Sequence, residues 1–158
     1  MVHGAPELKT ELRNYFVQRF SQDPVLDFDF DMENHSKISE EQSKLLEVIP
    51  SKEEIKNAVW ACGIDKAPGF DGFNFKFIRE MWHVIGDEIF DFVLKFFTSG
   101  ESVRSINVTW VALIPKLLSP LSIDDFRPIS MVGALYKIIS KLLSFRLKEV
   151  IAPLIDES

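Results

Sequence analysis

The stretch Lys66-Ala67-Pro68-Gly69-Phe70-Asp71-Gly72 separates two helix-like segments and consists almost wholly of residues that direct the backbone. Its proline fixes one φ angle, and its two glycines permit φ values that other residues avoid. Asp71 can accept hydrogen bonds from neighbouring backbone N–H groups, as aspartates in turns do. The stretch is therefore either a tight connector between helices or a loop whose N–H groups, with the Lys66 ammonium, bind a phosphate-bearing partner.

Amphipathic helices are predicted on both sides of this stretch from the spacing of apolar residues. The expected helices cover residues 7–20, 39–46, 51–62, 73–82, 86–97 and 133–150. Ser39 and Ser51 each stand three residues before a glutamine or glutamate, which is the capping-box pattern of a helix start. The helix at 86–97 has only a narrow polar stripe, so we expect it to be buried. Trp60 lies off the apolar stripe of its own helix and needs another contact surface.

Two short strands are predicted after these helices. Residues 107–114 are rich in β-branched and aromatic side chains, and Pro115 ends the run. Residues 126–130 can return as a second strand, which belongs at an edge because Pro128 donates no ladder hydrogen bond. If the strands pair, Lys116 and Arg127 come near the same end of a hairpin. The expected fold class is α+β, predominantly helical with a short antiparallel β-hairpin.

Length and composition favour one folded domain. The chain has 158 residues, of which 46% are hydrophobic, and this is enough for a real core. A single cysteine, Cys62, excludes a disulfide framework or a zinc cluster of cysteines, and we expect it to pack as a small apolar side chain. The sequence carries no signal-peptide pattern and no apolar run long enough for a bilayer. We expect an intracellular protein, cytoplasmic or nuclear, without a membrane partner.

Charge is segregated along the chain, whose net charge is −6. Residues 1–50 carry 5 basic and 10 acidic side chains, whereas residues 104–148 carry 7 basic and 2 acidic ones, a local net of +5. A basic segment in an acidic chain suggests that this segment has an anionic partner. An ordinary solvated face would have the same composition.

The helix predicted at 133–150 places its lysines on one side. Lys137, Lys141 and Lys148 share a stripe with Ser144, because their offsets match whole turns. The stripe either contacts the phosphates of a nucleic acid or keeps the helix soluble. Arg146 falls on the apolar side, where its charge needs a partner or a route to solvent.

Four stretches in order resemble the start of the reverse transcriptase domain of LINE-type non-LTR retrotransposons, particularly the plant type. They are Asp65-Lys66-Ala67-Pro68-Gly69-Phe70-Asp71-Gly72-Phe73, Leu113-Ile114-Pro115-Lys116, Asp125-Phe126-Arg127-Pro128-Ile129-Ser130 and Leu135-Tyr136-Lys137-Ile138-Ile139-Ser140-Lys141-Leu142-Leu143. The resemblance covers about residues 51–154. Residues 1–50 are similar, with less specificity, to the connector between the endonuclease and polymerase domains of those proteins. The expected organisation is a connector at 1–50, with one or two helices and an acidic linker, and a truncated reverse transcriptase domain at 51–158.

The resemblance implies part of an RNA-directed DNA polymerase with a right-hand fold, namely the fingers and the entry to the palm. By motif position, Lys116 and Arg127 would grip the incoming deoxynucleoside triphosphate, since an arginine fork binds phosphate oxygens bidentately. Arg127 can instead form a salt bridge to Asp124 or Asp125. The implied partners are an RNA template or RNA–DNA hybrid and a deoxynucleoside triphosphate. The expected nucleic-acid contacts are Lys66, Lys137, Lys141 and Lys148.

No catalytic or metal-binding residue is expected in this chain. The family's enzymes hold Mg²⁺ with palm aspartates, and the sequence ends at Ser158 before such a segment. Asp124-Asp125 is predicted to form a surface turn rather than a catalytic dyad. We expect a fragment without palm and thumb that binds nucleotide or nucleic acid and does not polymerise alone. The alternatives are an idle, mostly helical relic or protein-interaction module, and a palm supplied by adjacent coding sequence.

Overall fold

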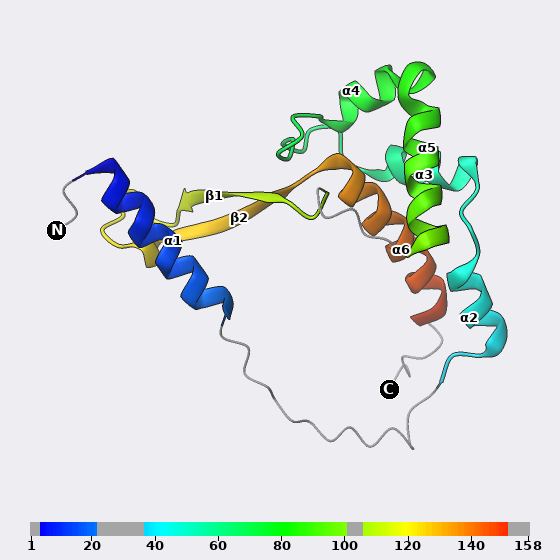
Figure 1. Cartoon of the computed structure of the whole chain (residues 1–158), viewed down its shortest axis with the longest axis horizontal. Coiled ribbons are helices and arrows are strands. Elements are labelled where there is room, and N and C mark those ends of the chain that lie inside the picture. Colours follow the sequence, from blue (N-terminus) through cyan, green and yellow to red (C-terminus); the bar gives the residue numbers. More distant parts are fainter. Residues whose placement is uncertain (1–3, 22–36, 101–105, 152–158) are drawn as a thin grey trace. The chain divides into compact units, whose positions relative to one another are not determined.

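A computed structural model of the chain describes residues 4–21, 37–100 and 106–151 (Figure 1). The elements are α1 (Ala5–Ser21), α2 (Glu40–Glu47), α3 (Lys52–Ala61), α4 (Phe75–Glu80), α5 (Trp82–Ser99), β1 (Thr109–Pro115), η3 (Ile123–Asp125), β2 (Phe126–Val132) and α6 (Ala134–Ile151). The expected α+β class is confirmed: the chain is mostly helical with one antiparallel pair of strands. The predicted acidic linker at 22–36 lies outside the described residues. No helix in the described ranges is long and apolar enough to cross a bilayer.

The chain divides into two compact units. The smaller one combines Met1–His35 with Pro115–Phe126, and the larger one combines Ser36–Ile114 with Arg127–Ser158. In the smaller unit, α1 confirms the helix predicted at 7–20. Leu12, Tyr15 and Phe16 are half-buried, whereas Leu8 and Phe20 on the same predicted face are exposed.

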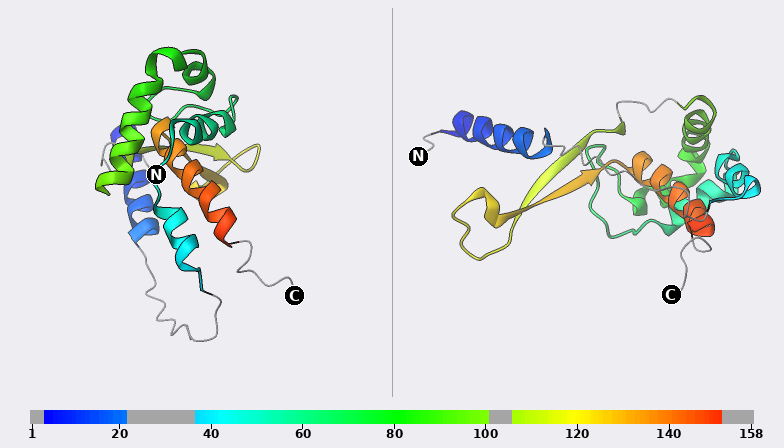
Figure 2. Two further views of the ribbon diagram at one scale, coloured as in Figure 1. Left: turned by 90° about the vertical axis from the view of Figure 1, so that its right-hand side faces the viewer. Right: turned by 90° about the horizontal axis from the view of Figure 1, so that it is seen from below.

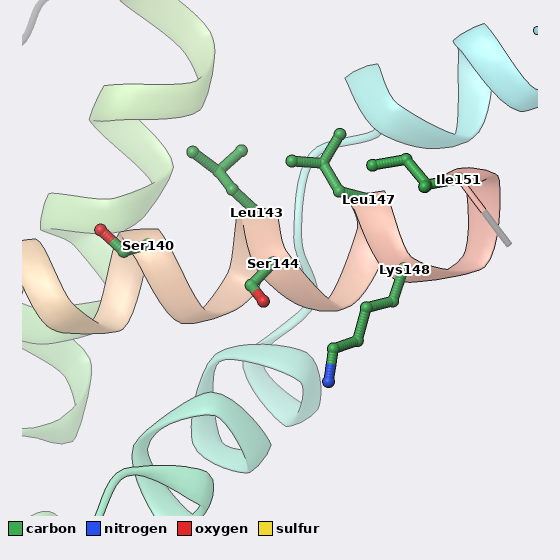
Figure 3. Close-up of a pocket in the computed structure, with 6 residues that line it drawn as sticks. All are labelled: Ser140, Leu143, Ser144, Leu147, Lys148 and Ile151. Atoms are coloured by element: carbon green, nitrogen blue, oxygen red, sulfur yellow. The ribbon is translucent and has the colours of Figure 1, made fainter. Parts of the chain in front are cut away.

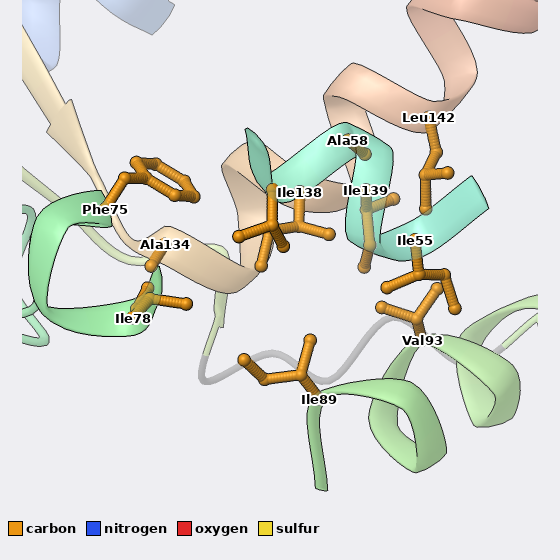
Figure 4. Packing of buried hydrophobic residues seen from close by; sticks show 11 residues of the cluster. Ile55, Ala58, Phe75, Ile78, Ile89, Val93, Ala134, Ile138, Ile139 and Leu142 are labelled. Atoms are coloured by element: carbon orange, nitrogen blue, oxygen red, sulfur yellow. The ribbon is translucent and has the colours of Figure 1, made fainter. Parts of the chain in front are cut away.

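The core of the larger unit is formed by α3, α4, α5 and α6 (Figure 4). Ile55, Ala58 and Val59 of α3 have no exposed area, because the spacing of three and four places them on one helix face. Burying one such large aliphatic side chain contributes about 1.5–3 kcal/mol. Residues from the other three helices complete the cluster: Phe75, Ile78, Ile89, Val93, Ala134, Ile138, Ile139 and Leu142.

The start of α5 differs from the prediction. The sequence predicts a helix from Gly86, whereas α5 begins at Trp82 and is separated from the end of α4 by Met81 alone. Gly86 is a close-packing position, since a Cβ atom there would lie 3.0 Å from the Trp82 indole. Trp82 also provides the contact that Trp60 was expected to need, with ring centroids 5.4 Å apart and edge-to-face.

The predicted burial of the broadly apolar helix is wrong in part. On α5, Ile89 and Val93 are buried, but Phe90, Phe96 and Phe97 are only partly buried against the core. Their rings cover the edge of the cluster instead of its centre. The helix has one buried face, as expected for an element at the border of a small core.

The glycine-rich stretch after α3 docks onto the start of α6. Gly69 is buried, and a Cβ atom there would lie 2.2 Å from the carbonyl oxygen of Val132. Asp71 accepts hydrogen bonds from the N–H of Phe73 at 3.3 Å and from the N–H of Ala134 at 2.6 Å. The predicted turn role of this aspartate is confirmed, and its carboxylate also caps α6 from a distant part of the chain.

The two predicted strands pair as a two-stranded sheet. β1 begins two residues later than predicted, and β2 continues two residues further, to Val132. Both strands are edges in a sheet of two, which satisfies the expectation that Pro128 sits in an edge strand. β2 leads into α6 through Gly133 alone, so the docked stretch at Gly69 contacts the junction between a strand and a helix.

Arg146 has the partner that the sequence required. Its guanidinium donates to the Glu54 carboxylate, from Nε at 2.8 Å and from Nη2 at 3.0 Å. Its Nη1 donates to the carbonyls of Leu46, at 3.1 Å, and Val48, at the end of α2. The side chain thereby joins α2 and α3 to α6, and α2 lies beside α6 in both views of Figure 2.

This pairing corrects one capping prediction. Ser39 and Gln42 form both bonds of a capping box at the start of α2, as predicted. At α3, the Ser51 hydroxyl accepts from the Glu54 N–H at 3.1 Å, but the Glu54 carboxylate binds Arg146. The second box is therefore only half formed, because a buried guanidinium holds the carboxylate.

Candidate functional site

Three of the four lysines expected to contact nucleic acid line one open pocket of about 450 Å³ in the larger unit. Lys66 comes from the turn after α3, and Lys137 and Lys141 come from consecutive turns of α6. The pocket also contains Cys62, Tyr136 and Ser140, together with apolar atoms of Ala61, Phe75 and Val132. The fold therefore brings together cations from two segments that are far apart in the sequence.

Local hydrogen bonds position the lysine-bearing elements. The Lys137 ammonium donates to the carbonyl oxygen of Ala67 at 3.1 Å, which ties α6 to the glycine-rich stretch. The Lys66 N–H bonds to the Gly63 carbonyl at 3.4 Å and closes the turn that carries its side chain. The Lys141 ammonium lies 5.3 Å from the centroid of the Phe145 ring, a favourable cation–π distance.

The wall formed by the end of α3 is held by Arg79. Its Nη2 donates to the carbonyl oxygens of Trp60 at 2.7 Å and Cys62 at 2.5 Å. These carbonyls would otherwise lack partners at the helix end, so the arginine acts as a C-terminal cap. The cap fixes the backbone at Cys62, which borders the pocket.

The pocket is positive although the whole chain has a net charge of −6. Among the residues that the structure describes, three lysines line it and no aspartate or glutamate does. Burial raises the pKa of the Cys62 thiol, while the charges of Lys141, Arg79 and Lys137 act to lower it. Positive potential therefore reaches the thiol, and the pocket suits an anionic ligand.

Cys62 is only partly the core residue that the sequence predicts. Its side chain packs against the hydrophobic cluster, yet it is half-buried and also lines the pocket. Tyr136 and Ser140 were not among the predicted site residues. Their spacing of four places them on one stripe of α6, adjacent to the stripe of Lys137 and Lys141, so the helical period is the signal that could have found them.

The fourth predicted lysine, Lys148, lies apart from this pocket. It lines a separate hollow of about 640 Å³ near the end of α6 with Ser140, Leu143, Ser144, Leu147 and Ile151. Figure 3 shows Leu143, Leu147 and Ile151 on one side of the helix and Ser144 and Lys148 on the other. The predicted apolar position Leu143 is 37% exposed.

Lys116 belongs to a compact turn in the smaller unit. Its backbone N–H donates to the Asp125 carbonyl at 2.7 Å, and its ammonium donates to the Asp124 carbonyl at 2.6 Å. The ammonium is exposed, so these bonds leave it in contact with solvent. Arg127 on β2 is also exposed, and no hydrogen bond or ion pair of its side chain occurs among the described residues.

Asp124 and Asp125 form the predicted turn. The Asp125 carboxylate accepts the N–H groups of Leu121 and Ser122, both at 2.9 Å, and these bonds lower the pKa of Asp125. The Asp124 carboxylate accepts the Tyr15 hydroxyl at 2.6 Å, which raises the pKa of Tyr15. Both carboxylates are thus engaged in hydrogen bonds, and within the described ranges no three His, Cys, Asp or Glu residues are grouped closely enough to hold a metal ion.

Comparison with known proteins connects the chain to a transposon. No family model matches the sequence. The chain is 27% identical over 150 residues to the uncharacterized 149 kDa protein of transposon TX1 from Xenopus laevis. The match covers 94% of this chain and 12% of the Xenopus protein, so the chain spans about an eighth of that protein's length. The similarity supports a transposon-related origin for the chain.

Proposed function

We propose that the chain is the fingers portion of an RNA-directed DNA polymerase of a non-LTR retrotransposon, and that it binds the phosphate backbone of RNA. The observation that carries the binding proposal is the pocket where Lys66, Lys137 and Lys141 converge without a lining carboxylate. The four motifs and the similarity to a transposon protein support the family assignment. Lys148, further along α6, would extend the backbone contact.

Ammonium groups suit this task because a phosphate backbone is recognised by charge. Each lysine that neutralises a phosphate releases condensed counterions, so affinity falls as salt rises. Contacts of this kind set position and orientation and carry no base sequence. The expected binding is therefore strongly salt-dependent and nearly uniform across RNA sequences.

The resemblance alone also suggests deoxynucleoside triphosphate contacts for Lys116 and Arg127. Both side chains are exposed, which leaves their cationic groups available to phosphates. Mg²⁺ accompanies such a nucleotide in the complete family enzyme, but the described ranges contain no group of three His, Cys, Asp or Glu residues that could hold a metal ion. We therefore assign binding, and no step of nucleotidyl transfer, to the described residues.

A triple variant, Lys66→Gln with Lys137→Gln and Lys141→Gln, tests this proposal, and its RNA binding is compared with that of the wild type. Glutamine keeps a polar side chain but removes the charge. Fluorescence anisotropy with a labelled single-stranded RNA at several salt concentrations should show weaker binding. The slope of log affinity against log salt should flatten by about 2, because three phosphate contacts of roughly 0.7 each are lost.

The matched control changes three exposed lysines outside the pocket, Lys44→Gln with Lys76→Gln and Lys95→Gln. Both triple variants have the same net charge, so a loss confined to the pocket variant identifies the site. Equal RNA binding by the wild type and the pocket variant at low salt would reject it, and the lysines would then serve solubility alone. Replacing Lys116 and Arg127 by glutamine should reduce triphosphate binding more than RNA binding.

A further inference from the structure

The lysine pocket has a second property that a phosphate contact alone does not need. Its lining includes Ala61, Phe75 and Val132 in addition to the three lysines. Phe75 is 2% exposed and belongs to the hydrophobic core, so this part of the lining is held in place by core packing. Binding sites for small organic groups combine such an apolar wall with a few polar groups and have volumes of about 300–1,000 Å³. A volume of about 450 Å³ lies in this range.

Two further side chains fit an aromatic, hydrogen-bonding ligand. Tyr136 lines the pocket and is 40% exposed, so part of its ring remains available for stacking. Ser140 stands one turn further along α6 and offers a hydroxyl that donates and accepts. The same pocket therefore presents an aromatic ring, a hydroxyl and three cations to one occupant.

We propose that this pocket takes one unpaired nucleotide of an RNA strand, with the phosphate at the lysines and the base against Tyr136 and the apolar wall. The inference rests on the proposed RNA binding and names the form of RNA that the pocket selects. A base in a duplex is stacked between its neighbours and paired, so it cannot enter. Single-stranded RNA should consequently bind more tightly than duplex RNA of the same length.

Tyr136 is the residue that separates this inference from simple charge binding. Base stacking on an aromatic side chain is sequence-tolerant and large enough to detect by alanine substitution. Tyr136→Ala should therefore lower affinity for a single-stranded RNA roughly tenfold and leave affinity for the duplex unchanged. Tyr136→Phe keeps the ring and should retain the preference, so it controls for any change in the fold.

Cys62 provides a direct measurement of occupancy. It is the chain's single cysteine and lines the pocket, so iodoacetamide labelling followed by mass spectrometry reports on this site alone. Saturating single-stranded RNA should slow the labelling several-fold, because the nucleotide covers the thiol. The same duplex at saturation, and inorganic phosphate at equal concentration, should protect much less.

The outcomes distinguish the two proposals. If the pocket lysines are needed for RNA binding, but single strands and duplexes bind equally and Cys62 stays reactive, backbone binding stands and the nucleotide pocket is rejected. Loss of binding in Tyr136→Phe as well as in Tyr136→Ala would also reject it, since the ring would not be the cause. If the wild type binds no RNA at low salt, both proposals fail.

Discussion

At position 146 a charged side chain occupies a place where the helical pattern calls for an apolar one. Arg146 is 6% exposed and donates to Glu54 and to the last carbonyls of α2, while its guanidinium lies 5.2 Å from the Phe97 ring centroid. Removing one partner of a buried pair costs about 3–5 kcal/mol, and the partly exposed Glu54 carboxylate favours the low end. We expect Arg146→Ala to lower the free energy of unfolding by about 3 kcal/mol in urea denaturation.

The neighbouring glutamates provide the control for this prediction. Glu54→Gln leaves the guanidinium without its counter-charge and should destabilise by about 1.5–3 kcal/mol, the range for hydrogen bonds to charged groups. Glu53→Gln changes the same charge on an exposed side chain one residue earlier and should have little effect. Equal stability of the two glutamine variants would contradict a structural role for the Arg146–Glu54 pair.

At the scale of an element, the start of α6 depends on a residue from the glycine-rich stretch. The N–H of Ala134 donates to the Asp71 carboxylate at 2.6 Å, so the cap of this helix is supplied by a distant turn. Losing an N-terminal cap costs about 0.5–2 kcal/mol. We expect Asp71→Ala to lower stability by about 1 kcal/mol. Amide hydrogen exchange should be faster in the first turn of α6.

Asp71→Asn keeps an acceptor oxygen and should recover most of this stability. Asp65→Ala removes an exposed carboxylate nearby in the same connection and should leave exchange in α6 unchanged. If Asp71→Ala speeds exchange throughout the larger unit equally, the carboxylate does not act as a local cap.

The elements themselves were largely predictable because their signals are local. Apolar spacing identified the helices, and the pairing of Ser39 with Gln42 identified one start. The misplaced start of α5 has a tertiary cause: Gly86 is required by the Trp82 ring above it, so the glycine does not mark a boundary. The half-formed cap at Ser51 has a similar cause, since Glu54 is drawn to an arginine on another helix.

For the whole molecule, the sequence predicted the lysines but not the pocket. The spacing of Lys137 and Lys141 follows from the helical period, and this stripe was predictable. Their meeting with Lys66 depends on Gly69 docking at the end of β2, a long-range contact without a periodic signal. Tyr136 and the apolar wall were missed for the same reason, because a cavity is a property of packing between elements.

An exposed apolar strip on α6 is expected to make the chain associate with itself in solution. Leu143, Leu147 and Ile151 of α6 are 37%, 43% and 41% exposed and follow at intervals of four residues (Figure 3). Contiguous apolar surface of this kind promotes association. Sedimentation velocity should therefore show the weight-average sedimentation coefficient rising with concentration in the micromolar range.

A charge within the strip should suppress this association. Leu147→Lys makes the strip discontinuous and should shift the chain to monomer without lowering its thermal midpoint, because the side chain is already 43% exposed. Val84→Lys places the same charge at an exposed apolar residue of α5 outside the strip, and it should leave association unchanged. A wild-type chain that stays monomeric at every concentration would show that the strip is too small to drive contact between copies.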